Sequence, residues 1–203
     1  MGRTSDAKER LIQAAMALIH ARSYADVGVQ ELCEHAGVKK GSFYHFFNTK
    51  QDLVLAALDQ WWAFARERNW NDAFSPTRPP LERIERFFEI NYEQNVAEFE
   101  LAGQFSGCPF GNLSIEMCCQ DDAIREKIHA IFDDVVGRLK QTLDDAVANK
   151  ILAPMDTQET ALALWAYCEG VLMLAKARQD LDLLRRLGKR AVRFLQGSGR
   201  KAA

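Results

Sequence analysis

The stretch from Gly28 to Lys50, GVQELCEHAGVKKGSFYHFFNTK, decides the fold of the chain. A first short helix, which ends at Gly37, has an apolar side formed by Leu32, Ala36 and Val38. After a two-residue break, a second short helix is expected from about Lys40, and its inward side is formed by Phe43, Phe46 and Phe47. Two short helices joined by a tight Gly-containing turn are typical of a helix-turn-helix unit, whose second helix can enter a DNA major groove.

The outward side of the second helix carries cations and hydroxyls and no carboxylates. Duplex affinity is dominated by neutralising backbone charge, so this chemistry suits phosphate binding. Lys50 adds a cation at the start of the next helix. The residues expected to contact DNA from the second helix and its approach are Lys39, Lys40, Gly41, Ser42, Tyr44 and His45. On spacing alone, a helical hairpin whose exposed face happens to carry lysines is an equal alternative.

Residues 7–60, and GSFYHFFNTKQDLV in particular, resemble the DNA-binding domain of the TetR/AcrR family of transcriptional regulators. The segment matches the pattern G-[ST]-[FL]-Y-x-x-F-x-x-K-x-x-L. The resemblance implies an all-α protein with a three-helix DNA-binding domain at 1–50 and a helical regulatory and dimerisation domain at 51–203. It also implies a repressor that binds a pseudo-palindromic double-stranded DNA operator.

The start of the first short helix departs from the family pattern. Many relatives place Thr or Ser where this chain has Gly28 and Val29. Gly28 is an acceptable helix cap, but Val29 cannot donate to a phosphate. The resemblance implies that Gln30 reads base edges, and glutamine suits adenine geometrically. An exposed helix residue with no DNA contact is the equal alternative for Gln30.

Composition and charge place the chain in the ordinary globular range. The 203 residues are 48% hydrophobic, with a net charge of -2. Residues 1–50 hold seven Lys or Arg against five Asp or Glu, and the remainder holds 19 against 23, so the basic part is the one expected to face phosphate. We expect a cytoplasmic protein with no membrane partner, because no secretory-signal or membrane-spanning stretch occurs and the five cysteines form no paired framework.

Helical periodicity continues along the whole chain, and no strand pattern interrupts it. The first helix has its apolar positions at Leu11, Ala14, Ala15, Leu18 and Ile19. Asn71–Pro80 is the clearest loop, since it contains two proline-bearing turns. Further helices are expected at Gln51–Trp70, Leu81–Phe99, Pro109–Cys119, Asp122–Ala148, Thr157–Ala177 and Asp180–Leu195.

The last two long helices carry broad apolar surfaces. One has Ala161, Leu164, Trp165, Cys168, Leu172 and Ala175; the other has Leu184, Leu187, Ala191, Phe194 and Leu195. An all-helical domain can bury such surfaces internally. The resemblance implies instead a homodimer through these two helices, which a two-fold operator requires.

Cys108 precedes Pro109, and proline favours the first position of a helix. Cys108 is therefore expected at the N-cap, where the helix dipole and free N–H groups stabilise a thiolate. Such a thiol reacts with electrophiles and oxidants. A small buried structural cysteine is the alternative.

The segment SGC-x-x-x-x-L-S-x-E-x-C, which begins at Ser106, resembles the part of electrophile- and hypochlorite-sensing TetR repressors that carries their reactive cysteine. The resemblance implies that oxidation or electrophile modification at Cys108 relieves operator binding, and that Lys176 reacts with the oxidised thiol. Lys176 near the sulfur would also favour the thiolate; a solvated residue near a helix end is its alternative. Cys118 is a candidate resolving thiol. Related segments also occur in members that bind small ligands without thiol chemistry.

A small-molecule effector, the alternative inducer, needs a pocket in the second domain. Tyr92, Phe105 and Trp165 are the expected wall of that pocket, although aromatic residues at helical spacing are more often core. The vicinal Cys118-Cys119 pair lacks a second pair to complete a metal site, so we expect no metal. No cofactor loop, paired-carboxylate motif or nucleophile elbow is present, and we expect no enzyme activity and no catalytic residue.

Overall fold

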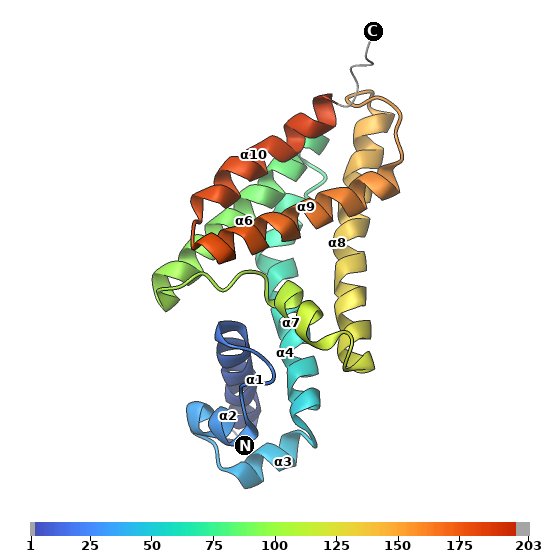
Figure 1. The fold of residues 1–203 in the computed structure, drawn as a ribbon. Helices are drawn as coiled ribbons and strands as arrows, with labels where there is room; N and C mark the ends of the chain where they lie inside the picture. Colours follow the sequence, from blue (N-terminus) through green and yellow to red (C-terminus); the bar gives the residue numbers. More distant parts are fainter. Residues whose placement is uncertain (1–2, 198–203) are drawn as a thin grey trace. The chain divides into compact units, whose positions relative to one another are not determined.

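The computed structural model describes residues 3–197, and these form helices without a strand. The helices group into two compact units (Figure 1). The first unit contains the chain up to Ala65 together with Pro109–Ile131, and the second contains Arg66–Cys108 together with the chain from Phe132 onward. The expected all-α fold is confirmed. The expected domain boundary after residue 50 stays a prediction. Each compact unit contains two separate stretches of the sequence, so the division into units does not test a single boundary.

The first unit is built around helix α1 (Arg3–Ala21), which packs on α2 (Val29–Ala36), α3 (Lys40–Phe46) and α4 (Lys50–Ala65). Helix α7 (Pro109–Met117) and the beginning of α8 (Asp122–Ala148) complete it. Its core contains most of the apolar positions expected from periodicity. The fully or nearly buried members are Leu11, Ala14, Ala15, Ile19, Leu32, Phe43 and Leu53.

The turn between α2 and α3 has the geometry that its sequence predicts. Gly37 follows α2 with φ 61°, a left-handed conformation that glycine adopts without a Cβ penalty. Its N–H reaches the carbonyls of Cys33 and Glu34 and closes the helix. Lys39 is extended and directly precedes α3. The two short helices and their tight turn therefore form the expected helix-turn-helix.

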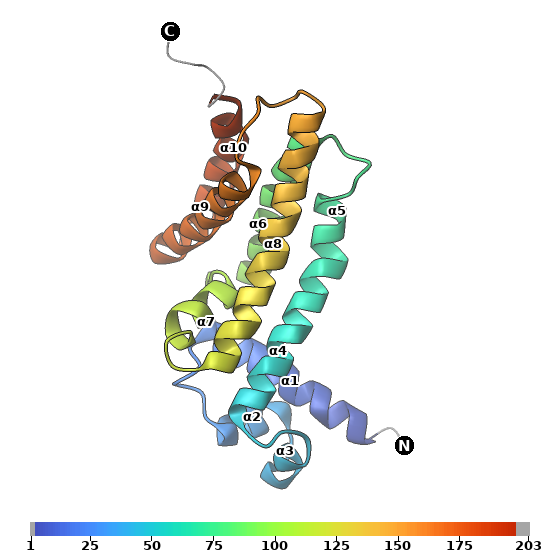
Figure 2. The ribbon, with the colours of Figure 1, turned by 90° about the vertical axis from the view of Figure 1, so that its right-hand side faces the viewer.

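The second unit contains a short π-helical turn, η1 (Arg66–Trp70), followed by α5 (Asn71–Ala73), α6 (Pro80–Ala102), most of α8, α9 (Thr157–Arg178) and α10 (Asp182–Gly197). Helix α10 packs along both α6 and α9, as Figures 1 and 2 show. Gly188 allows the close approach to α6, because a Cβ at this position would lie 3.0 Å from the Cβ of Phe88. Pro80 occupies the first helical turn of α6.

The π-helical turn η1 directly follows α4, where the sequence predicts one continuous helix from Gln51 to Trp70. Periodicity cannot reveal a local widening to i→i+5 hydrogen bonds. The turn directs Trp70 into the interior of the second unit, where it is 6% exposed. Its ring centroid lies 5.5 Å from that of Phe87 and 6.4 Å from that of Trp165, both in edge-on arrangements.

The apolar stripes of α9 and α10 correct one expectation. Most of the residues named for the dimer interface are buried within the chain itself, among them Ala161, Leu164, Trp165, Cys168, Leu172, Ala175, Leu184, Ala191 and Leu195. These side chains form core, because α10 packs on both α9 and α6, and Trp165 of α9 packs against Trp70 and Phe132. Of the residues named for the interface, Phe194 is left exposed, and so are three apolar residues of α9 that were not named: Leu162, Met173 and Leu174.

Arg83 holds the loop before α6 in the second unit. Its guanidinium donates to the carbonyl of Arg78 at 2.8 Å, the carbonyl of Pro76 at 3.1 Å and the Asp145 carboxylate of α8 at 2.5 Å. The Arg83 side chain is 9% exposed, and that of Asp145 is 33% exposed. A buried charge with three acceptors is costly to remove, because those acceptors lose their partner.

We therefore expect Arg83→Leu to destabilise the protein by about 2 kcal/mol, less than for a fully buried pair because Asp145 is partly solvated. This corresponds to a fall of roughly 4–8 °C in the melting temperature for a chain of this size. Arg185→Leu is the control, since its ion pair with Asp182 has 52% and 45% exposed partners; we expect a change within about 0.5 kcal/mol. Equal melting temperatures for Arg83→Leu and the native protein would contradict the assignment.

Candidate DNA-binding surface and sensing cysteine

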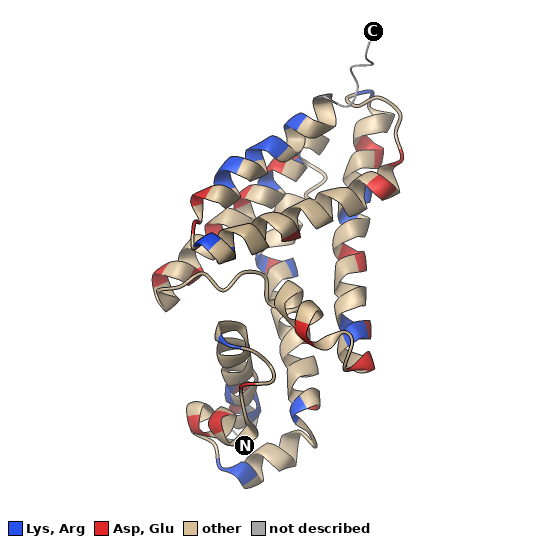
Figure 3. Cartoon of the chain, in the orientation of Figure 1, with Lys and Arg blue, Asp and Glu red and all other residues tan. Residues whose placement is uncertain are grey.

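Helix α3 presents a polar outward surface, whereas Phe43 anchors its inner side with no exposed area. Lys39 and Lys40 are exposed at its beginning, where Figure 3 shows the basic colour at the start of the helix. Further along the helix, the exposed Tyr44 ring packs edge-on against Phe43 with centroids 5.1 Å apart. Gly41 and His45 are also exposed, and Ser42 is half-buried. The structure thus brings the six residues expected on this helix together on one short segment.

Gln30 lies at the second position of α2 and is exposed. Its amide donates to the Glu34 carboxylate one helical turn later, at 2.8 Å. This bond holds the side chain along α2 and leaves its carbonyl oxygen and its second N–H available to an outside partner. A base contact by Gln30 stays a prediction.

Lys50 has an internal function that sequence spacing does not indicate. Its ammonium donates to the carbonyls of Tyr24 and Val27, at 2.8 and 3.0 Å, and lies 4.0 Å from the centre of the Tyr24 ring. Burial lowers the pKa of Lys50, and the nearby Glu116 carboxylate opposes this effect. Lys50 therefore ties the beginning of α4 to the loop between α1 and α2.

Glu116 of α7 binds the same loop. Its two carboxylate oxygens accept the backbone N–H groups of Tyr24 and Ala25, at 2.9 and 2.8 Å. One carboxylate thereby accepts from two successive backbone N–H groups. Hydrogen bonds to an ionised carboxylate are stronger than those between neutral groups. Sequence reasoning missed this contact, because the partners lie about ninety residues apart and an acidic residue on a helix usually faces solvent.

Cys108 lies directly before Pro109, where α7 begins, as the sequence predicts. The thiol is neither fully exposed nor buried. It is hydrogen-bonded to the carboxyl group of Glu169 in α9. Burial raises the pKa of Glu169 to about 7, and the contact with Cys108 opposes that rise. Sequence reasoning considered Lys176 as the ionisable neighbour of the sulfur and did not consider Glu169; Lys176 is exposed in the last turn of α9.

The segment before Cys108 is held to the end of α9 by Gln179. The Gln179 amide accepts the N–H of Phe105 at 2.9 Å and donates to the carbonyl of Phe105 at 3.0 Å. Gln179 itself has a left-handed φ of 50° and closes α9. Phe105 is 2% exposed. A side-chain amide that pairs with both backbone groups of one residue fixes the path of this segment.

The remaining cysteines differ in exposure. Cys118 directly follows α7 and is half-buried, with its sulfur 3.7 Å from the Ser114 hydroxyl. Cys119 is exposed. Cys33 and Cys168 are buried, and burial raises the pKa of both thiols, consistent with the expected core positions. Among the described residues, no group of three His, Cys, Asp or Glu side chains is placed to hold a metal ion.

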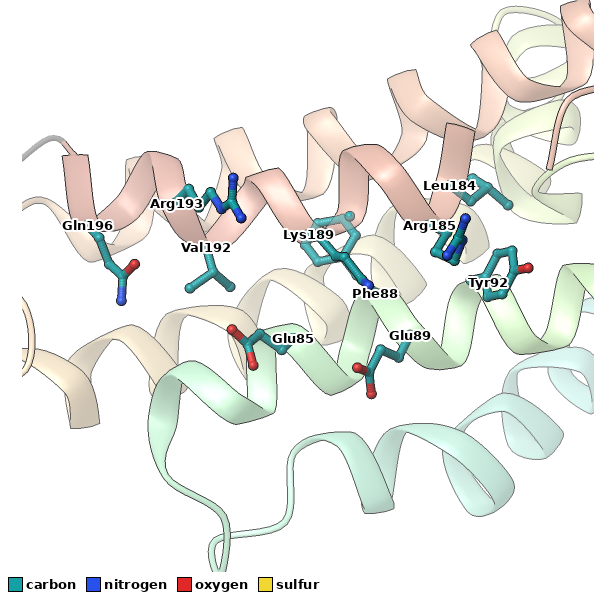
Figure 4. A pocket seen from close by; sticks show the side chains of 11 residues that line it. Glu85, Phe88, Glu89, Tyr92, Leu184, Arg185, Lys189, Val192, Arg193 and Gln196 are labelled. Carbon is teal, nitrogen blue, oxygen red and sulfur yellow. The ribbon is translucent and has the colours of Figure 1, made fainter. Parts of the chain in front are cut away.

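A groove of about 340 Å³ runs between α6 and α10 in the second unit (Figure 4). Phe88, Tyr92 and Val192 contribute its apolar lining, whereas carboxylates from α6 and cations from α10 line its edges: Glu85, Glu89, Arg185, Lys189 and Arg193. Tyr92 lines this groove, and its function as a wall of an effector pocket stays a prediction. The lining of this groove does not include Phe105 or Trp165, and Trp165 packs against Trp70 and Phe132 instead.

A helix-turn-helix with a cationic outer face, joined to a second helical unit, defines a DNA-binding regulator. Residues 11–57 match the model of the bacterial regulatory proteins of the tetR family, and residues 80–191 match the tetracyclin repressor-like C-terminal domain. The chain belongs to the TetR family of transcriptional regulators.

Individual relatives agree with this assignment. The transcriptional regulator AcuR of Cereibacter sphaeroides is 32% identical over 182 residues, which cover 88% of this chain and 80% of AcuR. The repressor NemR of Escherichia coli is 29% identical over 183 residues, 88% of each chain. Among solved structures, a TetR regulatory protein from Rhodobacter sphaeroides has a TM-score of 0.82 at 30% identity and covers 92% of this chain and 97% of that one. The reduced form of E. coli NemR has a TM-score of 0.75 at 25% identity and covers 91% and 95%.

These named relatives are transcriptional regulators, which confirms the expectation that the chain is not an enzyme. Among the described helices, α9 is long and apolar enough to cross a membrane by length and composition, and 39% of its most apolar window is buried. Core helices of globular proteins meet the same criteria, so this property alone assigns no membrane role.

Proposed function

We propose that this regulator is a cytoplasmic, homodimeric repressor that leaves its operator when an electrophile or oxidant modifies Cys108. The observation that carries the proposal is the position of Cys108. The accessible thiol lies directly before α7, and α7 holds the loop of the helix-turn-helix unit through Glu116. The likeness to NemR, whose solved form is a reduced one, supports the same chemistry.

The proposed operator contacts are made by the outer face of α3. Lys39, Lys40 and Ser42 bind phosphates, whereas Tyr44, His45 and the Gln30 carbonyl face base edges or sugars. Gly41 lets the backbone approach the duplex. Lys50 contributes indirectly, because its ammonium is bonded to the carbonyls of Tyr24 and Val27 and sets the loop that precedes α2.

The proposed dimer forms through α9 and α10. Helix α9 keeps an apolar face outside the chain's own core, with Leu162 42%, Met173 57% and Leu174 44% exposed, and Phe194 of α10 is 56% exposed. An exposed apolar face of this length is unfavourable in water, and a symmetry-related copy of the same face covers it. The dimer then presents two α3 helices to successive major grooves, roughly 34–36 Å apart.

Modification of Cys108 acts through a shift between two dimer populations, of which only one has the spacing that the operator requires. A group added at the sulfur separates Cys108 from Glu169 and displaces the beginning of α7. Lys176, exposed on the same helix as Glu169, is the proposed partner of the oxidised thiol, and Cys118 is the proposed resolving thiol. The displaced α7 carries Glu116 with it.

The test is operator binding by native protein and Cys108→Ser, measured by mobility shift on the upstream region of the gene with and without a quinone or hypochlorite. We expect the native protein to release the DNA and Cys108→Ser to stay bound at every concentration that releases the native protein. Cys119→Ser is the matched control, because Cys119 is the exposed cysteine of the same region. Release of Cys108→Ser at the native concentration would refute the covalent switch.

Glu116 supplies a separate prediction about coupling. Glu116→Ala removes both acceptors of the Tyr24 and Ala25 N–H groups, so α7 no longer holds the loop between α1 and α2. We expect Cys108 to be modified at the native rate. The factor by which the electrophile weakens operator binding should be at least about fivefold smaller in the variant than in the native protein, which corresponds to about 1 kcal/mol of coupling. Glu126→Ala, an exposed carboxylate of α8, should leave the response unchanged. A native response in Glu116→Ala would show that the loop is not the route.

The groove between α6 and α10 favours one alternative, a repressor induced by a small ligand that binds without reaction. Its aromatic floor and its cationic edge on α10 suit a small aromatic anion. In that case Cys108→Ser would respond to the inducer as the native protein does, and Lys189→Glu with Arg193→Glu, which reverses the cationic edge of the groove, would not.

A further inference from the structure

The thiol of Cys108 is hydrogen-bonded to the largely buried carboxyl group of Glu169. The proposed switch does not by itself require this contact. Cys108 is reachable from solvent, but its hydrogen-bond partner Glu169 lies in the middle of α9, next to the fully buried Cys168. The Glu169 Oε1 atom is buried and accepts no hydrogen bond in the part of the chain that the structure describes. An unpaired buried carboxylate oxygen costs stability, which points to a function for the group.

Hydrogen bonds in the backbone around Cys108 and around Glu169 hold the two side chains in position. Gln179 binds both backbone groups of Phe105, three residues before Cys108, and the rigid helix α7 follows Cys108. Glu169 is fixed on α9, whose N-terminus is capped by Asp156 through bonds to the N–H groups of Gln158 and Glu159. The sulfur and the carboxyl are therefore positioned by ordered backbone on each side.

The charges around Cys108 do not favour a thiolate before the reaction begins. A carboxylate disfavours a second negative charge on the neighbouring sulfur. A carboxyl whose pKa is raised to about 7, as for Glu169, is partly ionised at neutral pH and can accept a proton that a reaction releases. The arrangement therefore suits a thiol that loses its proton as it reacts.

We propose that Glu169 is the general base for Cys108 when the thiol adds to a soft carbon electrophile, an α,β-unsaturated carbonyl compound or a quinone. The sulfur forms a bond to the electron-poor carbon while the S–H proton passes to a carboxylate oxygen of Glu169. The carbon–carbon π electrons shift to form a double bond with the carbonyl carbon, and the carbonyl π electrons move to oxygen, giving an enolate. The enolate then takes one proton, from Glu169 or water, so that the adduct contains all atoms of both reactants. This proposal rests on the proposed function, because it concerns the chemistry of the same cysteine.

The test follows the alkylation of individual cysteines in the full-length protein by N-ethylmaleimide at neutral pH, with peptide mass spectrometry. We expect Glu169→Gln, which keeps the size and an acceptor oxygen but not the basicity, to slow labelling of Cys108 about tenfold. The exposed Cys119 of the same molecule is the internal control and should react at its native rate. An equal or faster rate at Cys108 in Glu169→Gln would overturn the proposal, since Glu169 would then only suppress the thiolate.

A second variant separates proton transfer from packing. Glu169→Ala should also react slowly, and added formate should restore the Cys108 rate in proportion to its concentration, whereas chloride at equal ionic strength should not. Slow labelling that formate leaves unchanged would assign the loss to packing and overturn the proposal. Operator release is measured on the same samples. If labelled Cys108 does not control release, the proposed function fails, while the ratio of labelling rates still decides the part that Glu169 plays.

Discussion

Reversing the charge of Lys39 and Lys40 to glutamate should lower operator affinity by about 100-fold or more at moderate salt. Both side chains are exposed at the beginning of α3, and each substitution replaces a phosphate-neutralising cation with an anion. A dimer loses four such cations. The logarithm of the affinity should therefore fall less steeply with the logarithm of salt concentration, with a slope that is smaller by about 3 to 4.

Fluorescence anisotropy with a labelled promoter fragment, at several salt concentrations, measures both quantities. Lys189→Glu with Arg193→Glu is the matched control, because it changes net charge equally but acts on exposed residues of α10. The control should retain most of the native affinity and the native salt slope. If both double variants lose affinity alike, net charge and not the face of α3 governs binding, and the assigned surface is wrong.

Placing glutamates at Leu174 and Phe194 should convert the protein into a monomer. Both side chains are about half exposed in the single chain, so the substitutions cost its own core little. In the proposed dimer they bury four carboxylates without partners, which costs several kcal/mol. Operator affinity should then fall by about 100-fold, because each half-site is bound by a separate molecule.

Sedimentation or light scattering gives the mass, and anisotropy gives the affinity. Leu101→Glu with Ile151→Glu is the control, since these exposed apolar residues lie outside the proposed interface. The control protein should remain a dimer. A dimeric Leu174→Glu, Phe194→Glu protein would exclude the α9–α10 interface.

Periodicity and capping chemistry were sufficient to predict the longer helices, but not the π-helical turn η1 or the short helix α5. Gly37 ends α2 in the left-handed conformation that glycine favours, and Pro109 begins α7 as a residue with a preset φ should. The outer residues of α3 were predictable for the same reason, since they follow from the phase of a short amphipathic helix. Such local properties need no knowledge of distant contacts.

The less predictable features all depend on tertiary contacts. Glu116 and the Tyr24 N–H lie 92 residues apart in the sequence, and Gln179 and Phe105 lie 74 residues apart. Apolar stripes indicate which face of a helix is buried but do not say whether the cover is the same chain or another copy. For α9 and α10 the stripe named from the sequence is mostly core; of its residues Phe194 is exposed, as are Leu162, Met173 and Leu174, which were not named. The carboxyl partner of Cys108 was hidden for the same reason.

The wide turn η1 has a consequence for how the two halves of the chain can change over evolutionary time. A π-helical turn takes up one residue more than an α-helical turn, so residues after it point in a direction offset from the one that α4 would continue. The contacts of Trp70 with Phe87 and Trp165 depend on this offset. Insertion or deletion of a single residue in Arg66–Trp70 would turn the Trp70 ring away from these partners, so we expect the length of this segment to vary less among relatives than that of an exposed loop.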